Sequence, residues 1–213
     1  LDNLIEKYIG QKLTNEQVAE VVSAACFVSN NQKVFLNENL KITDDLKEIC
    51  NQYQSGGTEK EGRGILDEYY TDDKIVNAVR NLIKDHLQNK VEISVLEPSV
   101  GTGNFLYATK DLALKSIITA FEINETTAKI AKILHPEAEI NLRSFETEFI
   151  DGRGNKKEDY LIYDVIIGNP PYGEHRGLYK GLGEEPKIAK YEDYFVKRSL
   201  DSLRADGILA MVL

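Results

Sequence analysis

Residues 91–105 read Val91-Glu92-Ile93-Ser94-Val95-Leu96-Glu97-Pro98-Ser99-Val100-Gly101-Thr102-Gly103-Asn104-Phe105. The first six residues are mostly apolar and β-branched, which favours a buried strand that ends at Glu97-Pro98. Gly101 and Gly103 permit a tight turn and the close approach of a ligand to the backbone. A helix is predicted from about Leu106. A strand, a glycine turn and a helix in this order begin a βαβ unit of the nucleotide-binding type, so an α/β fold is predicted.

An acidic residue stands at the end of the next predicted strand. Ser116–Phe121 is β-rich and runs into Glu122, about 20 residues after the glycine turn. A carboxylate at that place can accept hydrogen bonds from both ribose hydroxyls of a nucleoside. The third glycine of the dinucleotide fingerprint is absent, because Leu106 stands in its place. The predicted ligand is therefore a nucleoside without a pyrophosphate rather than NAD.

The apolar run Tyr163–Gly168 predicts another strand, and it stops at Asn169-Pro170-Pro171-Tyr172. Proline fixes φ and has no backbone donor, so the two prolines must end the strand. This end presents one amide side chain, bare backbone carbonyls and an aromatic face, which can hold a flat molecule that carries an amino group. The alternative is a proline turn with a packing tyrosine. Because ligands bind at the carboxyl ends of strands in open sheets, Glu97, the glycine turn, Glu122 and Asn169 should converge on one crevice.

The segments before the glycine turn divide into two predicted units. Residues 1–54 are expected to be helical, with Thr14 and Thr43 as caps, and a glycine-rich polar connection follows. We therefore predict a helical subdomain at 1–62 and a main domain at 63–213. Thr71 or Asp72 can cap the amphipathic helix that follows, Lys74 to about His86. The alternative for Thr71 is that this helix start binds a carboxylate of a ligand.

Beyond Glu122, predicted strands and helices continue to alternate along the chain. A short third strand is predicted at 139–142, and Phe145 behind it either flanks the ring of a bound nucleoside or packs in the core. The other expected elements are a helix at 124–134, a turn at 151–155, a polar loop at 173–186, a helix at 188–204 and a fifth strand after Gly207.

Composition limits the class of protein. The 213 residues are 42% hydrophobic and 29% charged, which is ordinary for a globular chain, and the net charge is −9. That charge argues against broad electrostatic binding to nucleic acid, so any such contact must be local. The two cysteines and three scattered histidines predict neither a disulfide framework nor a metal site. Without a signal peptide or a membrane-spanning run, a cytoplasmic protein is expected. The chain begins at Leu1 and ends within an apolar run, so we expect part of a longer protein.

The motifs at residues 97–105, Glu122 and Asn169–Tyr172, in this order, resemble class I methyltransferases that use S-adenosylmethionine. The Asn-Pro-Pro-Tyr form is similar above all to N6-adenine DNA methyltransferases of the restriction-modification type. The resemblance covers roughly residues 64–213 and implies a Rossmann-like, doubly wound methyltransferase sheet that is incomplete at its C-terminus. It implies Asn169, Pro170 and Tyr172 as catalytic residues. The cofactor-binding residues that it implies are Tyr70, Thr71, Glu97, Pro98, Gly101, Gly103, Phe105, Glu122, Ile123, Phe145 and Asn169.

The resemblance further implies DNA as the partner, and S-adenosylmethionine as the cofactor. The chain departs from the family pattern because Ser144 stands where an acidic residue often contacts the cofactor adenine. This chain also lacks the later strands of the family, the second aromatic residue that stacks on the base, and a target recognition domain. We therefore expect weak cofactor binding and little methylation by this segment alone. Methylation of RNA adenine or of a protein glutamine amide, and a non-catalytic binding module, remain open alternatives.

Overall fold

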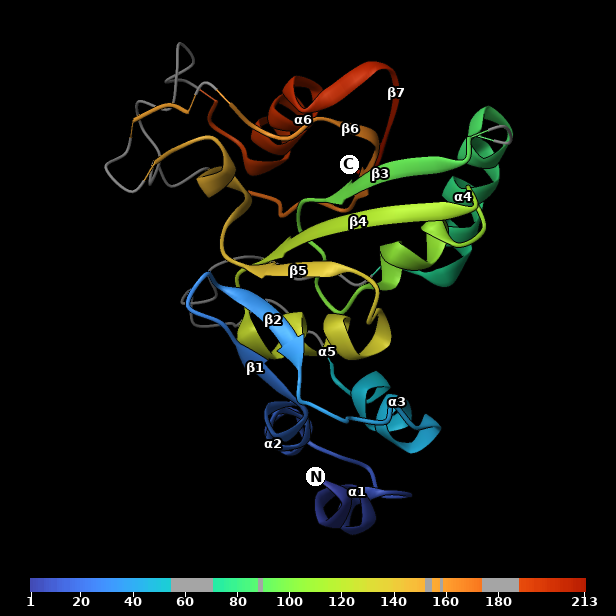
Figure 1. Ribbon diagram of the computed structural model, residues 1–213, viewed down its shortest axis with the longest axis vertical. Helices are drawn as coiled ribbons and strands as arrows, with labels where there is room; N and C mark the ends of the chain where they lie inside the picture. The colour runs from blue at the N-terminus through green and yellow to red at the C-terminus, as the bar shows by residue number, and fades with distance from the viewer. Residues whose placement is uncertain (55–70, 88–89, 152–154, 158, 174–187) are drawn as a thin grey trace.

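The computed structural model describes residues 1–54, 71–87, 90–151, 155–157, 159–173 and 188–213. Within them lies a seven-stranded sheet of order β1-β2-β5-β4-β3-β6-β7 (Figure 1). The strands are β1 (Cys26–Val28), β2 (Lys33–Leu36), β3 (Glu92–Glu97), β4 (Lys115–Glu122), β5 (Glu139–Leu142), β6 (Tyr163–Gly168) and β7 (Leu203–Met211). The five strands from β5 to β7 are parallel, which confirms the predicted doubly wound α/β sheet.

Several helices begin at a residue that supplies a side-chain cap. Thr14 and Thr43 accept hydrogen bonds from the backbone N–H groups of Gln17 and Leu46, and Asn124 caps the helix after β4 in the same way. The α-helices are α1 (Asp2–Tyr8), α2 (Asn15–Ala25), α3 (Asp44–Asn51), α4 (Asp73–Leu87), α5 (Glu125–Leu134) and α6 (Tyr191–Asp201). Among the described helices, none has the length and hydropathy to cross a bilayer.

The segment after the glycine turn differs from its prediction. An α-helix was expected from Leu106, but residues Asn104–Thr109 form the 3-10 helix η1. Thr109 ends it, because its hydroxyl donates to the carbonyl of Leu106 at 2.7 Å and competes with the next helical turn. The connection from β3 to β4 therefore contains a short 3-10 helix in place of the expected α-helix.

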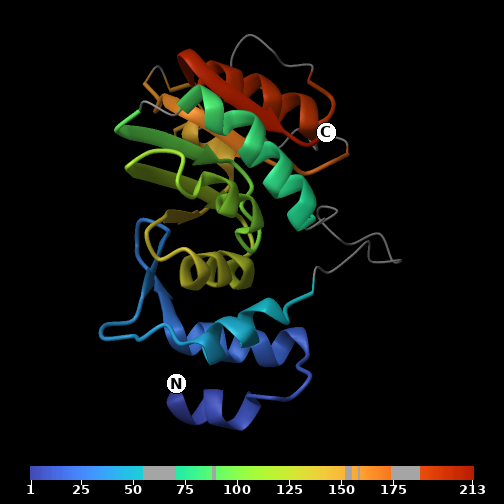
Figure 2. The ribbon, with the colours of Figure 1, turned by 90° about the vertical axis from the view of Figure 1, so that its right-hand side faces the viewer.

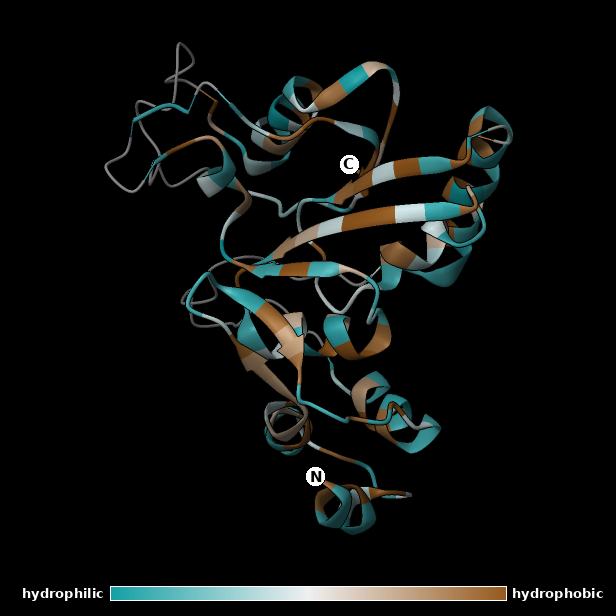
Figure 3. Cartoon of the chain, in the orientation of Figure 1, coloured by the Kyte–Doolittle hydropathy of each residue, from teal (hydrophilic) through white to brown (hydrophobic). Residues whose placement is uncertain are grey.

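The sheet carries a hydrophobic core on each face. Val95, Val165 and Ile167 point into the core that contains residues of α4 and α5. The alternate residues Leu96 and Ile166 point into a second core, which is aromatic and is covered by α6. Because side chains alternate along a strand, this division shows helices on both faces. Figure 2 shows the layers from the side, and in Figure 3 the central strands are largely hydrophobic.

The N-terminal segment is not wholly helical, which corrects the sequence prediction. β1 and β2 form a hairpin whose second strand pairs antiparallel with β5, through Lys33 opposite Asn141 and Val34 opposite Ile140. These strands were missed because they are only three and four residues long, too short to show an alternating pattern. The hairpin joins the N-terminal segment to the main sheet (Figure 1). The division at residue 62 stays a prediction.

The switch in strand order lies at β3, which has β4 on one side and β6 on the other. Asp164 fixes the alignment of β3 and β6, because its carboxylate accepts hydrogen bonds from the backbone N–H and hydroxyl of Ser94 and from Arg204 of β7. These contacts lie near the amino ends of the strands. At their carboxyl ends, Glu97 and Gly168 are consequently neighbours, and this is where the candidate site forms.

Candidate functional site

Glu97 lies at the floor of the site, between the ends of β3 and β6. Its side chain is 1% exposed, and its Oε1 accepts a hydrogen bond from the backbone N–H of Ser99 at 3.1 Å. A Cβ atom added to Gly168 would stand only 2.5 Å from the same Oε1. Gly168 is therefore the residue that lets β6 pass beside this carboxyl group, because any side chain would occupy the place of the acid.

Burial changes the acidity of Glu97. Loss of solvation, with a smaller contribution from nearby Glu122, raises the pKa of its carboxyl group to about 8 against the opposing effect of the hydrogen bond from Ser99. Glu97 is consequently mostly protonated at neutral pH. A cation bound beside it would favour the charged form, so the site can respond to a positively charged ligand by releasing a proton.

The Glu97→Gln variant should have a flatter pH dependence of stability than the wild type. Because the pKa in the folded state exceeds the unfolded value of about 4.5, the unfolding free energy of the wild type should fall between pH 5 and pH 8. The relative loss is on the order of 3 kcal/mol. Denaturant unfolding at several pH values measures it, and glutamine keeps the acceptor for Ser99. Parallel profiles for the two proteins would contradict a buried, protonated Glu97.

Glu122 closes the opposite side of the site. Its carboxylate accepts hydrogen bonds from three backbone N–H groups, those of Gly101, Ile123 and Asn124, each at 2.8 Å. The contact with Gly101 spans 21 residues and ties the end of β4 to the glycine turn. Gly103 in that turn has a φ of +96°, which glycine adopts without strain. The predicted approach of Glu122 to the turn is thus present.

Hydrogen bonds hold Asn169 at the end of β6. The Tyr172 hydroxyl donates to its side-chain carbonyl oxygen at 2.7 Å, and its NH₂ group donates to the Thr71 hydroxyl at 3.3 Å. The Ser99 hydroxyl donates to its backbone carbonyl at 3.1 Å. Desolvation raises the pKa of Tyr172, so its hydroxyl stays a donor at neutral pH. The sequence predicted Tyr172 as an aromatic face, and its bond to Asn169 was not foreseen.

Thr71 and Asp72 have different roles in the structure. Asp72 caps α4, because its carboxylate accepts the backbone N–H of Lys74 at 2.7 Å. Thr71, which is 8% exposed, instead contacts Asn169, and its backbone carbonyl accepts from Asn104 at 3.4 Å. Tyr70, the predicted neighbour in this segment, lies outside the described residues.

The remaining predicted residues divide into buried and exposed ones. Phe105 and Phe145 are 3% and 2% exposed and lie in the two cores, and Pro98 is buried. Phe145 packs against Phe121, Phe149 and Phe195. Of the two alternatives for its ring, the structure therefore shows packing in the core. Ile123 is 50% exposed beside Glu122 and is available to a ligand. Pro170 is buried directly after Asn169.

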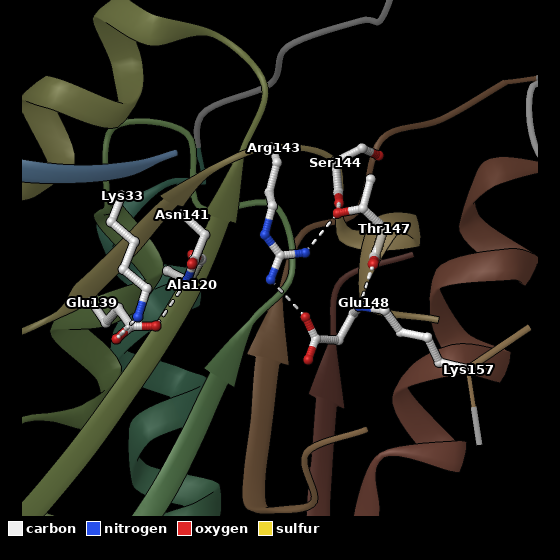
Figure 4. A network of polar contacts seen from close by, with 9 residues as sticks. All are labelled: Lys33, Ala120, Glu139, Asn141, Arg143, Ser144, Thr147, Glu148 and Lys157. Atoms are coloured by element: carbon white, nitrogen blue, oxygen red, sulfur yellow. Dashed lines mark hydrogen bonds and ion pairs between the residues drawn. The ribbon is translucent and has the colours of Figure 1, made fainter. Parts of the chain in front are cut away.

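A buried acid that the sequence analysis did not single out lies after β5. Ser144 donates a hydrogen bond to Glu146, whose carboxyl group is 3% exposed and whose pKa is raised to about 7 by burial. An acidic group thus stands beside Ser144, although the sequence position itself lacks one. Figure 4 shows the polar network around Ser144, in which Arg143 bonds to Thr147 and Glu148 at 2.6 and 2.7 Å. These contacts join residues at most five positions apart and hold the loop after β5.

A family model described as "Eco57I restriction-modification methylase" matches residues 14–213. The chain belongs to this family. The match includes the hairpin of the N-terminal segment as well as the parallel sheet, and it confirms the resemblance to restriction-modification methyltransferases.

Curated relatives of this Eco57I-family chain include two viral proteins. The "Defense against restriction protein B" of Escherichia phage P1 is 28% identical over 181 residues, which cover 84% of the chain and 7% of that protein. The modification methylase CviBIII of Paramecium bursaria Chlorella virus NC1A is 30% identical over 134 residues, which cover 61% of the chain and 33% of that protein. The chain therefore spans a third or less of the length of these two relatives.

A solved structure shows the same fold. A protein from Listeria monocytogenes, described as a class I S-adenosylmethionine-dependent methyltransferase, superimposes with a TM-score of 0.57 at 15% identity. The superposition covers 98% of the Eco57I-family chain and 62% of that protein. The fold is thus that of class I methyltransferases.

Proposed function

We propose that this protein transfers a methyl group from S-adenosylmethionine to the exocyclic N6 amino group of adenine in DNA, as part of a restriction-modification system. The observation that carries the proposal is the Asn169 side chain, which is fixed at the switch point of the sheet beside Glu97 and the glycine turn. Family membership and the fold support methyl transfer, and the Asn-Pro-Pro-Tyr sequence supports an amino group as the acceptor.

The residues of the crevice suit S-adenosylmethionine, which is a nucleoside that carries a sulfonium and an ammonium group. The Glu122 carboxylate already accepts three backbone N–H groups and is oriented at the end of β4, where it can accept ribose hydroxyls. Glu97 offers a buried acid to a cation, and the exposed Ile123 offers an apolar surface to the adenine. When bound, this cofactor supplies an electrophilic methyl group.

The task of the chain's own residues is to make a poor nucleophile reactive. The lone pair of the adenine amino nitrogen is delocalised into the ring. The side-chain oxygen of Asn169 and the backbone oxygen of Pro170 would each accept one N–H bond of that nitrogen, which favours a pyramidal nitrogen with a directed lone pair. This is positioning combined with stabilisation of positive charge that develops in the transition state. The product proton is acidic and passes to solvent, so no strong general base is required.

Tyr172 would stack on the adenine, an interaction worth roughly 1–3 kcal/mol per base. A base in duplex DNA must leave the helix to reach Asn169. Since the net charge is −9, we propose that the DNA is held by local contacts and by a target recognition domain or subunit outside these residues. A cytoplasmic location belongs to the same proposal.

The deciding experiment is methyl transfer from labelled S-adenosylmethionine by the full-length protein to DNA, RNA and protein, followed by identification of the labelled product. We expect the label in N6-methyladenine of DNA. Label in RNA adenine or in a glutamine amide would replace the proposed substrate with that one. Absence of label in all three would leave a cofactor-binding module without catalysis, and calorimetry with S-adenosylmethionine would then test the crevice alone.

A further inference from the structure

We propose that Thr71 is a positioning residue for this reaction: its hydroxyl holds the NH₂ end of the Asn169 amide, so that the carbonyl end faces the target amino group. The inference rests on the proposed function and adds a residue that acts on the catalytic asparagine. It differs from the sequence interpretation of Thr71, which placed it at a helix start that caps the helix or binds the carboxylate of a ligand.

The hydroxyl of Thr71 is not needed by its own helix. Asp72 supplies the cap of α4 through its side chain, and the backbone carbonyl of Asp72 accepts the N–H groups of Ile75 and Val76. Thr71 is 8% exposed, and its hydroxyl accepts a hydrogen bond from Asn169, 98 residues further along the chain, at 3.3 Å. The side chain is therefore turned away from the helix and into the site.

An amide has two ends of similar shape and opposite hydrogen-bonding character. Only the carbonyl end can accept an N–H of adenine, whereas the NH₂ end would oppose the target amino group. In the structure Thr71 contacts the NH₂ end and the Tyr172 hydroxyl contacts the carbonyl end. The carbonyl oxygen thus faces the aromatic side chain on which the base would stack. Entry of the base then replaces the Tyr172 hydroxyl at this oxygen, while the bond to Thr71 stays.

The backbone around this amide is fixed independently. The Ser99 hydroxyl donates to the backbone carbonyl of Asn169, and Asn104 donates to the backbone carbonyl of Thr71. Removal of the Thr71 hydroxyl therefore leaves both backbone segments held and removes the contact that holds the NH₂ end of the amide. This allows the two roles of Thr71, toward Asn169 and toward the cofactor, to be separated by kinetics.

The test compares Thr71→Val and Thr71→Ser with the wild type in the full-length protein. Valine keeps the shape and removes the hydroxyl, and serine keeps the hydroxyl and removes the methyl group. We expect Thr71→Val to lower kcat for methyl transfer to DNA about tenfold. The KM for S-adenosylmethionine and its calorimetric Kd should stay within twofold of the wild-type values. Thr71→Ser should restore kcat, and thermal unfolding of each variant reports whether it is folded.

Each contrary outcome has a definite meaning. A higher KM and Kd with an unchanged kcat would show that Thr71 binds the cofactor, and that overturns the inference. An unchanged kcat in Thr71→Val, or an equal loss in Thr71→Ser, also overturns it, because the hydroxyl would not be what matters. A wild-type protein that binds the cofactor but transfers no methyl group would remove the proposed function, and the inference with it.

Discussion

Replacing Asn169 with alanine should lower kcat for methyl transfer by about 10²–10³-fold while leaving the affinity for S-adenosylmethionine almost unchanged. The side-chain oxygen is the acceptor that draws the amino nitrogen out of conjugation, and alanine removes it without closing the crevice. The cofactor affinity is expected to persist, because the proposed contacts to the cofactor come mainly from Glu97, the glycine turn and Glu122. Single-turnover methyl transfer and calorimetry measure the two quantities separately.

A matched control is Asn77→Ala, because Asn77 is exposed on α4. This variant should retain wild-type kcat and stability. A second comparison is Asn169→Asp, which keeps an oxygen acceptor but loses the NH₂ group that bonds to Thr71. We expect it to retain more activity than Asn169→Ala. If Asn169→Ala and Asn77→Ala were equally active, Asn169 would be only a structural residue at the end of a strand.

Replacing Gly103 with alanine should destabilise the fold by about 3 kcal/mol and weaken cofactor binding. Two costs add. Gly103 has a φ of +96°, which a residue with a Cβ atom adopts with strain. A Cβ atom there would also stand 2.7 Å from Cδ2 of His135, which is 1% exposed and packs against Tyr107 at 4.6 Å between ring centroids. His135 has no room to retreat, so the glycine turn must move.

Gly10→Ala is the control that separates the two costs. Gly10 has a φ of +71°, and a Cβ atom there would meet nothing within 4 Å. Denaturant unfolding should show a smaller loss for Gly10→Ala, which carries the backbone strain alone. An equal loss in the two variants would contradict the close approach of His135 to the turn. Calorimetry with S-adenosylmethionine should show weaker binding for Gly103→Ala only.

The rule that ligands bind at the carboxyl ends of parallel strands predicted that Glu97, Glu122 and Asn169 lie at neighbouring strand ends, and the structure places them there. Their role as a binding site stays a prediction. The bonds from Thr71 and Ser99 to Asn169 were missed, because they join residues 98 and 70 positions apart. Such contacts depend on packing across the whole sheet. Glu146 was missed for the same reason, since its burial depends on the aromatic core and leaves no local pattern.

Errors in the elements have local causes. The helix after the glycine turn became a 3-10 helix, because hydrogen bonding by Thr109 outweighed the helix propensity of the preceding residues. The hairpin of β1 and β2 was missed, because its strands are very short and lie beside a strong helical pattern. The whole segment was therefore predicted to be helical. The helix caps at Thr14 and Thr43 were predicted correctly, since a cap requires only a few adjacent residues.

The hairpin of β1 and β2 has a consequence for synthesis of the protein on the ribosome. Its second strand, β2, pairs with β5. An ion pair of 2.7 Å between Lys33 and Glu139 joins these strands across 106 positions of the sequence. At 5–20 residues per second, the hairpin waits about 5–20 s for β5 to be made. An isolated two-stranded hairpin is only marginally stable. During this interval Val34 and Cys26, which are 2% and 3% exposed in the folded protein, lack the later residues that contact them and are open to chaperones and to other nascent chains. Substitutions in this hairpin should therefore act on the yield of folded protein rather than on the rate of methyl transfer.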